Sequence, residues 1–171
     1  YVRNLAQLVQ QRLSSGLRVW VEYSNEVWNG QFPQAAYANN VLRPKYGVST
    51  AGEAYGRRSA EIFDIFSGQI ANPSTRLVRV LAGETANSAV LTQNLKGAAG
   101  SGVLNAGVAA VAPYFSINTD ELYQQYLQGT VDLNTVFADL HSAVDSTMKL
   151  AADNQKIAAA NKLPLVSYEG G

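Results

Sequence analysis

The sequence contains no cysteine, and its only histidine is His141. Disulfide bonds, thiolate nucleophiles and cysteine-ligated zinc or iron–sulfur centres are therefore excluded. One histidine cannot supply a multi-histidine metal site, and its place in the middle of a predicted helix indicates a structural or exposed role. We expect no metal and no other cofactor to take part in the chemistry of this chain.

An excess of charge of one sign is also missing, because the 13 basic residues balance the 13 acidic ones. No basic stripe is present to bind nucleic acid, and no polybasic segment is present to bind an anionic membrane. No apolar run reaches the roughly 18 residues needed to span a bilayer. With 47% hydrophobic residues among 171, the chain can form one domain with a sizeable core.

Two kinds of apolar pattern alternate along the chain. Short β-branched runs predict strands at about 18–23, 77–82, 108–114 and 165–168. Helical spacing predicts a first helix with an apolar face of Leu5, Leu8, Val9 and Leu13, and further helices at about 31–42, 51–70, 87–97, 119–128 and 132–161. Arg43-Pro44 is expected to interrupt the second helix, and the glycine-rich residues 97–102 are expected to form a loop.

Two of the predicted helices carry long apolar stripes. The expected buried residues are Ile62, Phe63, Ile65, Phe66 and Ile70 in the first, and Val136, Phe137, Leu140, Val144, Met148 and Ile157 in the second. Apolar strands separated by helices predict an α/β fold with a parallel sheet covered on both faces. A doubly wound sheet and a (β/α)₈ TIM barrel both fit this pattern.

The number of strands favours part of a barrel. The chain opens with a predicted helix and stops just after a predicted strand. A complete barrel takes about 250 residues, so four strands with their helices make about half of one. We expect residues 1–171 to be an incomplete TIM barrel, a partial catalytic domain from a longer protein. Its exposed sheet edges would leave it poorly stable or inactive alone.

Carboxylates follow the first and the last predicted strand. The first strand leads into Asn25 and Glu26, with Trp28 just beyond, and the last leads into Glu169. Glu84 and Tyr114 follow the two strands between them. Residues at the carboxyl ends of barrel strands line the active site, and glycoside hydrolysis is the commonest chemistry built on paired carboxylates.

These residues resemble a known family. The sequence Glu-Tyr-Ser-Asn-Glu-Val-Trp-Asn at 22–29 resembles the fourth strand of clan A glycoside hydrolases, where an asparagine immediately precedes the acid/base glutamate. The ending Val-Ser-Tyr-Glu-Gly-Gly resembles the seventh strand of that clan, which carries the nucleophile. Two strands lie between them, as in the clan. The resemblance spans nearly the whole chain, as helix three to strand seven, and implies that strands one to three and eight are absent from it.

The resemblance implies a retaining double displacement in which Glu26 is the acid/base and Glu169 the nucleophile. Asn25 would contact the 2-hydroxyl of the sugar, and Tyr114 would hydrogen-bond Glu169. The remaining candidates for substrate contact are Trp28, Phe32 and Glu84. The implied partner is a β-linked polysaccharide or oligosaccharide, and the full-length protein would be secreted and monomeric.

Alternatives remain open at this point. A noncatalytic carbohydrate-binding protein could keep the same barrel and aromatic cleft. A doubly wound hydrolase is disfavoured, because no Gly-x-Ser-x-Gly elbow, no Gly-x-Gly-x-x-Gly turn after a strand and no phosphate-binding loop is present. On an extended strand Glu22, Ser24 and Glu26 share a face, so Glu22 either points into the barrel and forms an ion pair there or the strand bends.

Overall fold

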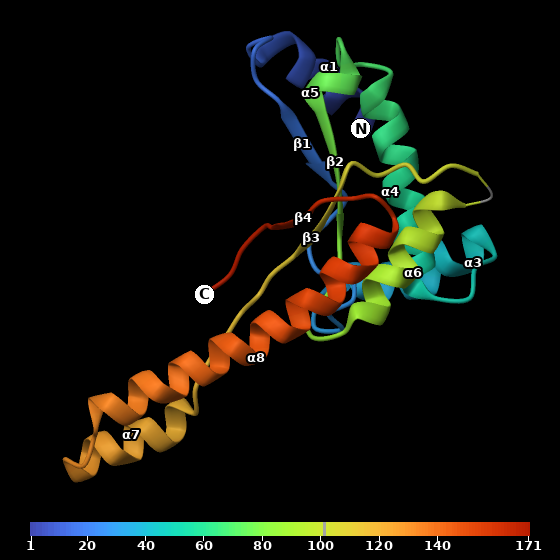
Figure 1. Ribbon diagram of the computed structural model, residues 1–171. Helices are drawn as coiled ribbons and strands as arrows, with labels where there is room; N and C mark the ends of the chain where they lie inside the picture. The colour runs from blue at the N-terminus through green and yellow to red at the C-terminus, as the bar shows by residue number, and fades with distance from the viewer. Residues whose placement is uncertain (101) are drawn as a thin grey trace.

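The computed structural model describes residues 1–100 and 102–171 (Figure 1). Its strands are β1 (Val19–Glu22), β2 (Leu77–Ala82), β3 (Val108–Val111) and β4 (Leu165–Ser167). Its helices are α1 (Val2–Arg12), α2 (Pro33–Tyr37), the π-helical η1 (Ala38–Leu42), α3 (Arg43–Tyr46), α4 (Ala51–Ser67), α5 (Pro73–Arg76), α6 (Ser88–Ala99), α7 (Thr119–Gln128) and α8 (Leu133–Ala160). The predicted α/β pattern is therefore confirmed.

The four strands form one parallel sheet in the order β1-β2-β3-β4. The register pairs Glu22 with Val80, Val80 with Val108, and Ala110 with Val166. Paired residues of neighbouring parallel strands point to the same face of the sheet. Because the spatial order follows the chain order, crossovers of one hand all lie on the same side of the sheet.

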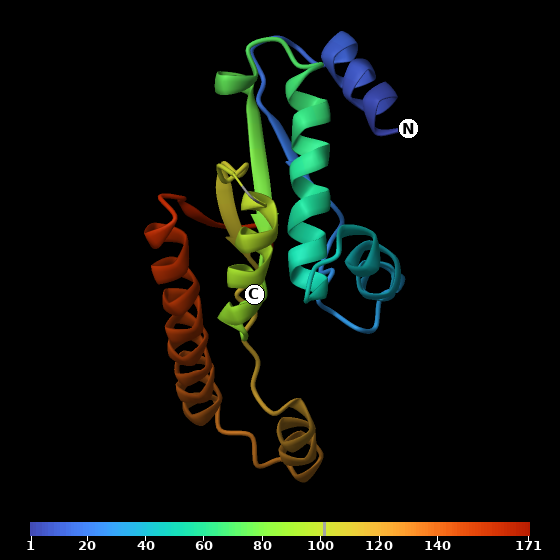
Figure 2. The same cartoon turned by 90° about the vertical axis from the view of Figure 1, so that its right-hand side faces the viewer.

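Helices cover only one face of this sheet. The strand residues of that face are Val19, Val21, Leu77, Leu81, Ala109 and Leu165, and they pack with residues of α1, α4, α6 and α8. Figure 2 shows α4, α6 and α8 side by side in chain order. The expectation of a sheet covered on both faces is thus wrong for the described residues, since the strand order never reverses as it does in a doubly wound sheet.

The opposite face carries a smaller cluster, which consists of Val80, Ala82, Val108 and Ala110 with Val78, Trp28, Val166 and Tyr168. None of these residues belongs to a helix. Trp20, on the same face at the start of β1, is 55% exposed. We call this surface the helix-free face.

Two glycines let α4 and α6 pack closely. A Cβ on Gly56 would collide with the backbone of Asn94, and a Cβ on Gly97 would collide with the backbone of Glu53. Gly97 therefore belongs to α6, which continues to Ala99. The prediction of a loop at 97–102 is therefore wrong for residues 97–99, which are helical. Gly97 is a glycine because α4 packs closely against it, not because the chain turns there. Ser101 lies outside the described residues.

The chain also continues as a helix through Arg43-Pro44, against the prediction of an interruption. Proline removes one backbone donor and its ring crowds the carbonyl four residues earlier. Here η1 widens the helix in the turn before Pro44, which then lies in the first turn of α3. A π-turn thus accommodates the proline within a continuous helical segment.

The hairpin of α7 and the first half of α8 projects away from the sheet (Figure 1). No residue of α7 is buried. Phe137 and Met148, both predicted to be core residues of α8, are each 59% exposed. The residues of α8 that are buried are Thr147, Asn154 and Ala158. Of the predicted stripe, Ile157 packs on the core and Val136 lies beside residues of α7, whereas Phe137 and Met148 stay exposed, which apolar spacing alone could not show.

Candidate functional site

The loop after β1 holds Glu26 in an unusual backbone conformation. Ser24 and Glu26 have φ angles of 59° and 45°, in the left-handed region that non-glycine residues adopt uncommonly. Asn29 Nδ2 donates a hydrogen bond to Glu26 Oε2 at 3.0 Å, and Asn29 N donates to Glu26 O at 2.9 Å. These bonds close the turn and hold the carboxylate at the carboxyl end of β1.

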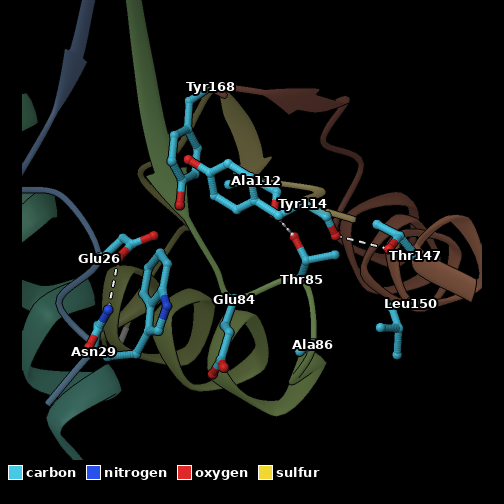
Figure 3. Close-up of a pocket in the computed structure, with 11 residues that line it drawn as sticks. Glu26, Asn29, Glu84, Thr85, Ala86, Ala112, Tyr114, Thr147, Leu150 and Tyr168 are labelled. Carbon is cyan, nitrogen blue, oxygen red and sulfur yellow. Dashed lines mark hydrogen bonds between the residues drawn. The ribbon is translucent and has the colours of Figure 1, made fainter. Parts of the chain in front are cut away.

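A cavity of about 400 Å³ opens beside this carboxylate. Figure 3 shows side chains from the loops after β1, β2, β3 and β4 and from α8 around it. The lining residues are Glu26, Trp28, Asn29, Glu84, Thr85, Ala86, Ala112, Tyr114, Thr147, Leu150 and Tyr168. The site therefore lies at the carboxyl ends of the strands, where ligands bind in parallel α/β sheets.

Polar bonds fix the far wall of the cavity. Thr85 Oγ1 donates to Ala112 O at 2.7 Å, and Thr147 Oγ1 donates to Tyr114 O at 2.9 Å. The fully buried Asn154 of α8 donates to Thr85 O at 3.0 Å. The middle of α8 is thus tied to the loops after β2 and β3.

The segment after β4 runs alongside the loop after β3. Tyr168 N donates to Val111 O at 3.2 Å, and Phe115 N donates to Gly171 O at 3.0 Å. Ser167 Oγ donates to the main-chain oxygen of Glu169 at 2.6 Å. These bonds place the exposed Glu169 at the rim of the site, next to Tyr114.

Tyr114 lines the cavity and responds to both predicted catalytic carboxylates. Its interaction with Glu169 raises the pKa of Tyr114, and partial desolvation and the charges of Glu169 and Glu26 act in the same direction. The phenol therefore stays protonated and can donate to a carboxylate.

Tyr168 lines the cavity, and Glu22 at the end of β1 acts on Tyr168. Burial raises the pKa of Tyr168, and the charges of Glu26, Glu22 and Glu169 raise it further. Burial, followed by the charge of Glu169, raises the pKa of Glu22 to about 7. Glu22 takes part in no ion pair among the described residues, so the ion pair considered from the sequence does not form there.

Six of the seven predicted site residues can be placed with respect to the cavity directly. Glu26, Trp28, Glu84 and Tyr114 line it. Asn25 is exposed and does not line it; its main-chain oxygen accepts a bond from Gln34 Nε2 at 2.9 Å. Phe32 lies at the start of α2 and is 38% exposed, also outside the cavity. The seventh, Glu169, meets the site through Tyr114.

The sequence analysis missed Asn29, Thr85, Thr147, Asn154 and Tyr168. Strand alternation could have identified Tyr168, because Val166 and Tyr168 lie two residues apart and share the helix-free face. No local pattern marks Thr147 or Asn154, because their partners are distant in the sequence.

No family model, no curated protein and no solved structure matches this chain. The fold and site alone define it as an α/β protein with a parallel sheet and a cavity of carboxylates and aromatic rings. In the described residues no helix is both long and apolar enough to cross a membrane.

Proposed function

We propose that this chain is part of a retaining glycoside hydrolase that cleaves β-linked polysaccharides or oligosaccharides. The observation that carries the proposal is the cavity at the carboxyl ends of the strands, which Glu26 and Tyr114 line and at whose rim the segment with Glu169 is held by the bond from Phe115 N to Gly171 O. Two carboxylates that flank one cavity at the carboxyl edge of a parallel sheet are suited to glycoside cleavage. Trp28 and Tyr114 add ring faces in the same cavity.

We further propose that the sheet is four consecutive strands of a (β/α)₈ barrel. The strand order β1-β2-β3-β4 and the single helix-covered face both support this fold. In a barrel the helix-free face would become the interior, which is filled by side chains of alternate strands. Val80, Ala82, Val108 and Ala110 are small or branched, as such an interior requires.

The proposed reaction has two steps. Glu26 gives its proton to the glycosidic oxygen as the bond to the anomeric carbon breaks, and an oxygen of Glu169 bonds to that carbon. Glu26 then takes a proton from water, whose oxygen displaces Glu169 from the anomeric carbon. Asn29 would hold the Glu26 carboxyl through both steps, and Tyr114 would orient Glu169.

The test is replacement of each glutamate in the full-length protein that contains residues 1–171, assayed on soluble β-1,4-glucan and on a panel of 4-nitrophenyl β-glycosides. Glu169→Gln removes the nucleophile, and Glu26→Gln removes the proton donor, so each variant should lose nearly all turnover. Azide can replace the missing acid/base or nucleophile: Glu26→Ala should yield a β-glycosyl azide, and Glu169→Ala an α-glycosyl azide.

Asp139→Asn, an exposed change on the projecting part of α8, is the matched control. Loss of turnover in the control as well would point to damage of the fold. Binding of glucan without any turnover by the unaltered full-length protein would instead favour a noncatalytic carbohydrate-binding protein on the same fold.

A further inference from the structure

A third carboxyl group, that of Glu22, acts on Tyr168, which lines the proposed site. Glu22 is the last residue of β1, and the register places it on the helix-free face beside Val80 and Val108. Its neighbours in the sheet are therefore apolar. An ionised carboxylate in such a place is costly unless it is paired.

Two polar atoms near this place lack hydrogen-bond partners. Glu22 Oε1 and the Tyr168 hydroxyl are both buried and unbonded among the described residues. The two side chains interact, because the charge of Glu22 acts on Tyr168. A protonated carboxyl donates a hydrogen bond and a phenol oxygen accepts one, so a single proton would satisfy both groups.

No cation in the described chain neutralises Glu22. The ion pairs present join Arg58 to Glu61, Lys96 to Glu53 and Lys156 to Asp153. The titratable groups that do act on or near Glu22 are Tyr55 of α4, Tyr168 and Glu169 after β4, and Glu26 through Tyr168. The sheet neighbours from β2 and β3 are the valines named above. The surroundings thus favour the neutral acid.

We propose that Glu22 is a positioning residue, which in its protonated form donates a hydrogen bond to Tyr168, directly or through one water, and so holds Tyr168 in the site. This inference rests on the proposed function. The two carboxyl groups lie in different surroundings, because Glu22 is on the apolar helix-free face and Glu169 is exposed at the rim.

The proposal has a pH-dependent consequence. The pKa of Glu22 is raised to about 7, so Glu22 loses its proton just above neutral pH. The hydrogen bond to Tyr168 is then lost, and a buried anion faces the charge of Glu169. Turnover should therefore fall as the pH rises above 7, and the neutral amide of Glu22→Gln should prevent the fall.

Carbon-13 NMR of the full chain, labelled at glutamate carboxyl carbons, tests the protonation state without an activity assay. The resonance that disappears in Glu22→Gln is that of Glu22, and we expect its midpoint within about one unit of pH 7. A midpoint below pH 5 would overturn the proposal. Should Glu22→Gln fail to fold, Tyr168→Phe provides a second test. This change removes the phenol oxygen that accepts the hydrogen bond from Glu22, so the titration midpoint of one glutamate must change and those of the others must stay the same.

The pH profile of kcat on 4-nitrophenyl β-glycosides tests the positioning role. The kcat of Glu22→Gln divided by the kcat of unaltered protein should be near one at pH 5. It should approach about tenfold at pH 8, where roughly nine-tenths of Glu22 is ionised. Tyr168→Phe should also flatten the profile, and combining it with Glu22→Gln should add nothing further. Parallel profiles for Glu22→Gln and unaltered protein would contradict the inference.

The two proposals fail in different ways. If Glu169→Gln keeps full turnover, the glycosidase mechanism is wrong whatever Glu22 does. If Glu169→Gln is inactive but the Glu22 resonance titrates in the ordinary range of a glutamate, the mechanism stands and the role of Glu22 falls.

Discussion

At the scale of single residues, the loop after β1 is the most specialised part of the chain. Two non-glycine residues with positive φ occur within three positions, at Ser24 and Glu26. Such conformations persist where the surrounding structure holds them, often at functional sites. Here the hydrogen bonds from Asn29 hold Glu26.

Asn29→Ala should reduce turnover, because it removes the side-chain donor that holds Glu26. A hydrogen bond of this kind contributes about 0.5–1.5 kcal/mol, so kcat should fall by roughly 2- to 12-fold while KM changes little. Steady-state kinetics on aryl β-glycosides measures both constants. Asn39→Ala, at an exposed asparagine whose side chain bonds only to Asn40, is the control. A kcat equal to that of the control would show that Asn29 does not position the acid.

Glu22→Gln should stabilise the fold in alkaline solution. The folded-state pKa of Glu22, about 7, lies above its ordinary value of 4.5. The native state therefore binds more protons than the unfolded chain between pH 4.5 and 7, and the stability from the protonated acid is lost as pH rises through that window. The amide variant should melt at the same temperature as unaltered protein at pH 4 and higher at pH 8.

Thermal denaturation followed by circular dichroism measures this difference, with Asp139→Asn as the reference for a changed surface charge. A Tm difference between Glu22→Gln and unaltered protein that is constant from pH 4 to 8 would mean that Glu22 titrates normally.

At the scale of elements, the close contact of α4 with α6 determines where the loops of the site begin. Gly56 and Gly97 lie where the two helices meet. Next to this contact, Lys96 Nζ of α6 lies 2.5 Å from Glu53 Oε1 of α4. Glu53 is only 6% exposed, and the hydrogen bond from Lys96 is the first cause that lowers its pKa.

Gly97→Ala should separate the helices, because the new Cβ would collide with the backbone of Glu53. Overpacking of this kind lowers the free energy of unfolding by about 1–3 kcal/mol. The new methyl group would meet main-chain atoms of Glu53, which cannot rotate away as a side chain could. Urea denaturation measures the free energy of unfolding. Gly16→Ala, where a Cβ meets nothing within 4 Å, should leave stability nearly unchanged. Equal stability of the two variants would exclude the close contact.

The sequence was sufficient to identify strands and most helices, because β-branched runs and helical spacing depend on local residues. It was insufficient where a partner decides the outcome. The spacing that marked Phe137 could not reveal that this part of α8 projects from the fold. The resemblance directed attention to Asn25 as a sugar contact and gave no role to Asn29, which bonds Glu26 because the left-handed turn brings residue 29 back to the carboxylate.

At the scale of the whole molecule, the strand order and the single layer of helices are the main facts. Together they favour a singly wound arrangement over a doubly wound one. The cavity lies at the carboxyl edge of that sheet, and residues from all four strand-end loops meet there (Figure 3). The account of function therefore depends on whether these loops perform a double displacement.

Proton NMR of the first sugar released from a β-linked glucan tests that claim most directly. Two successive displacements at the anomeric carbon restore its configuration, so the account predicts that the β-anomer appears first and then mutarotates. Release of the α-anomer first would mean a single displacement by water, and Glu169 would not be the nucleophile.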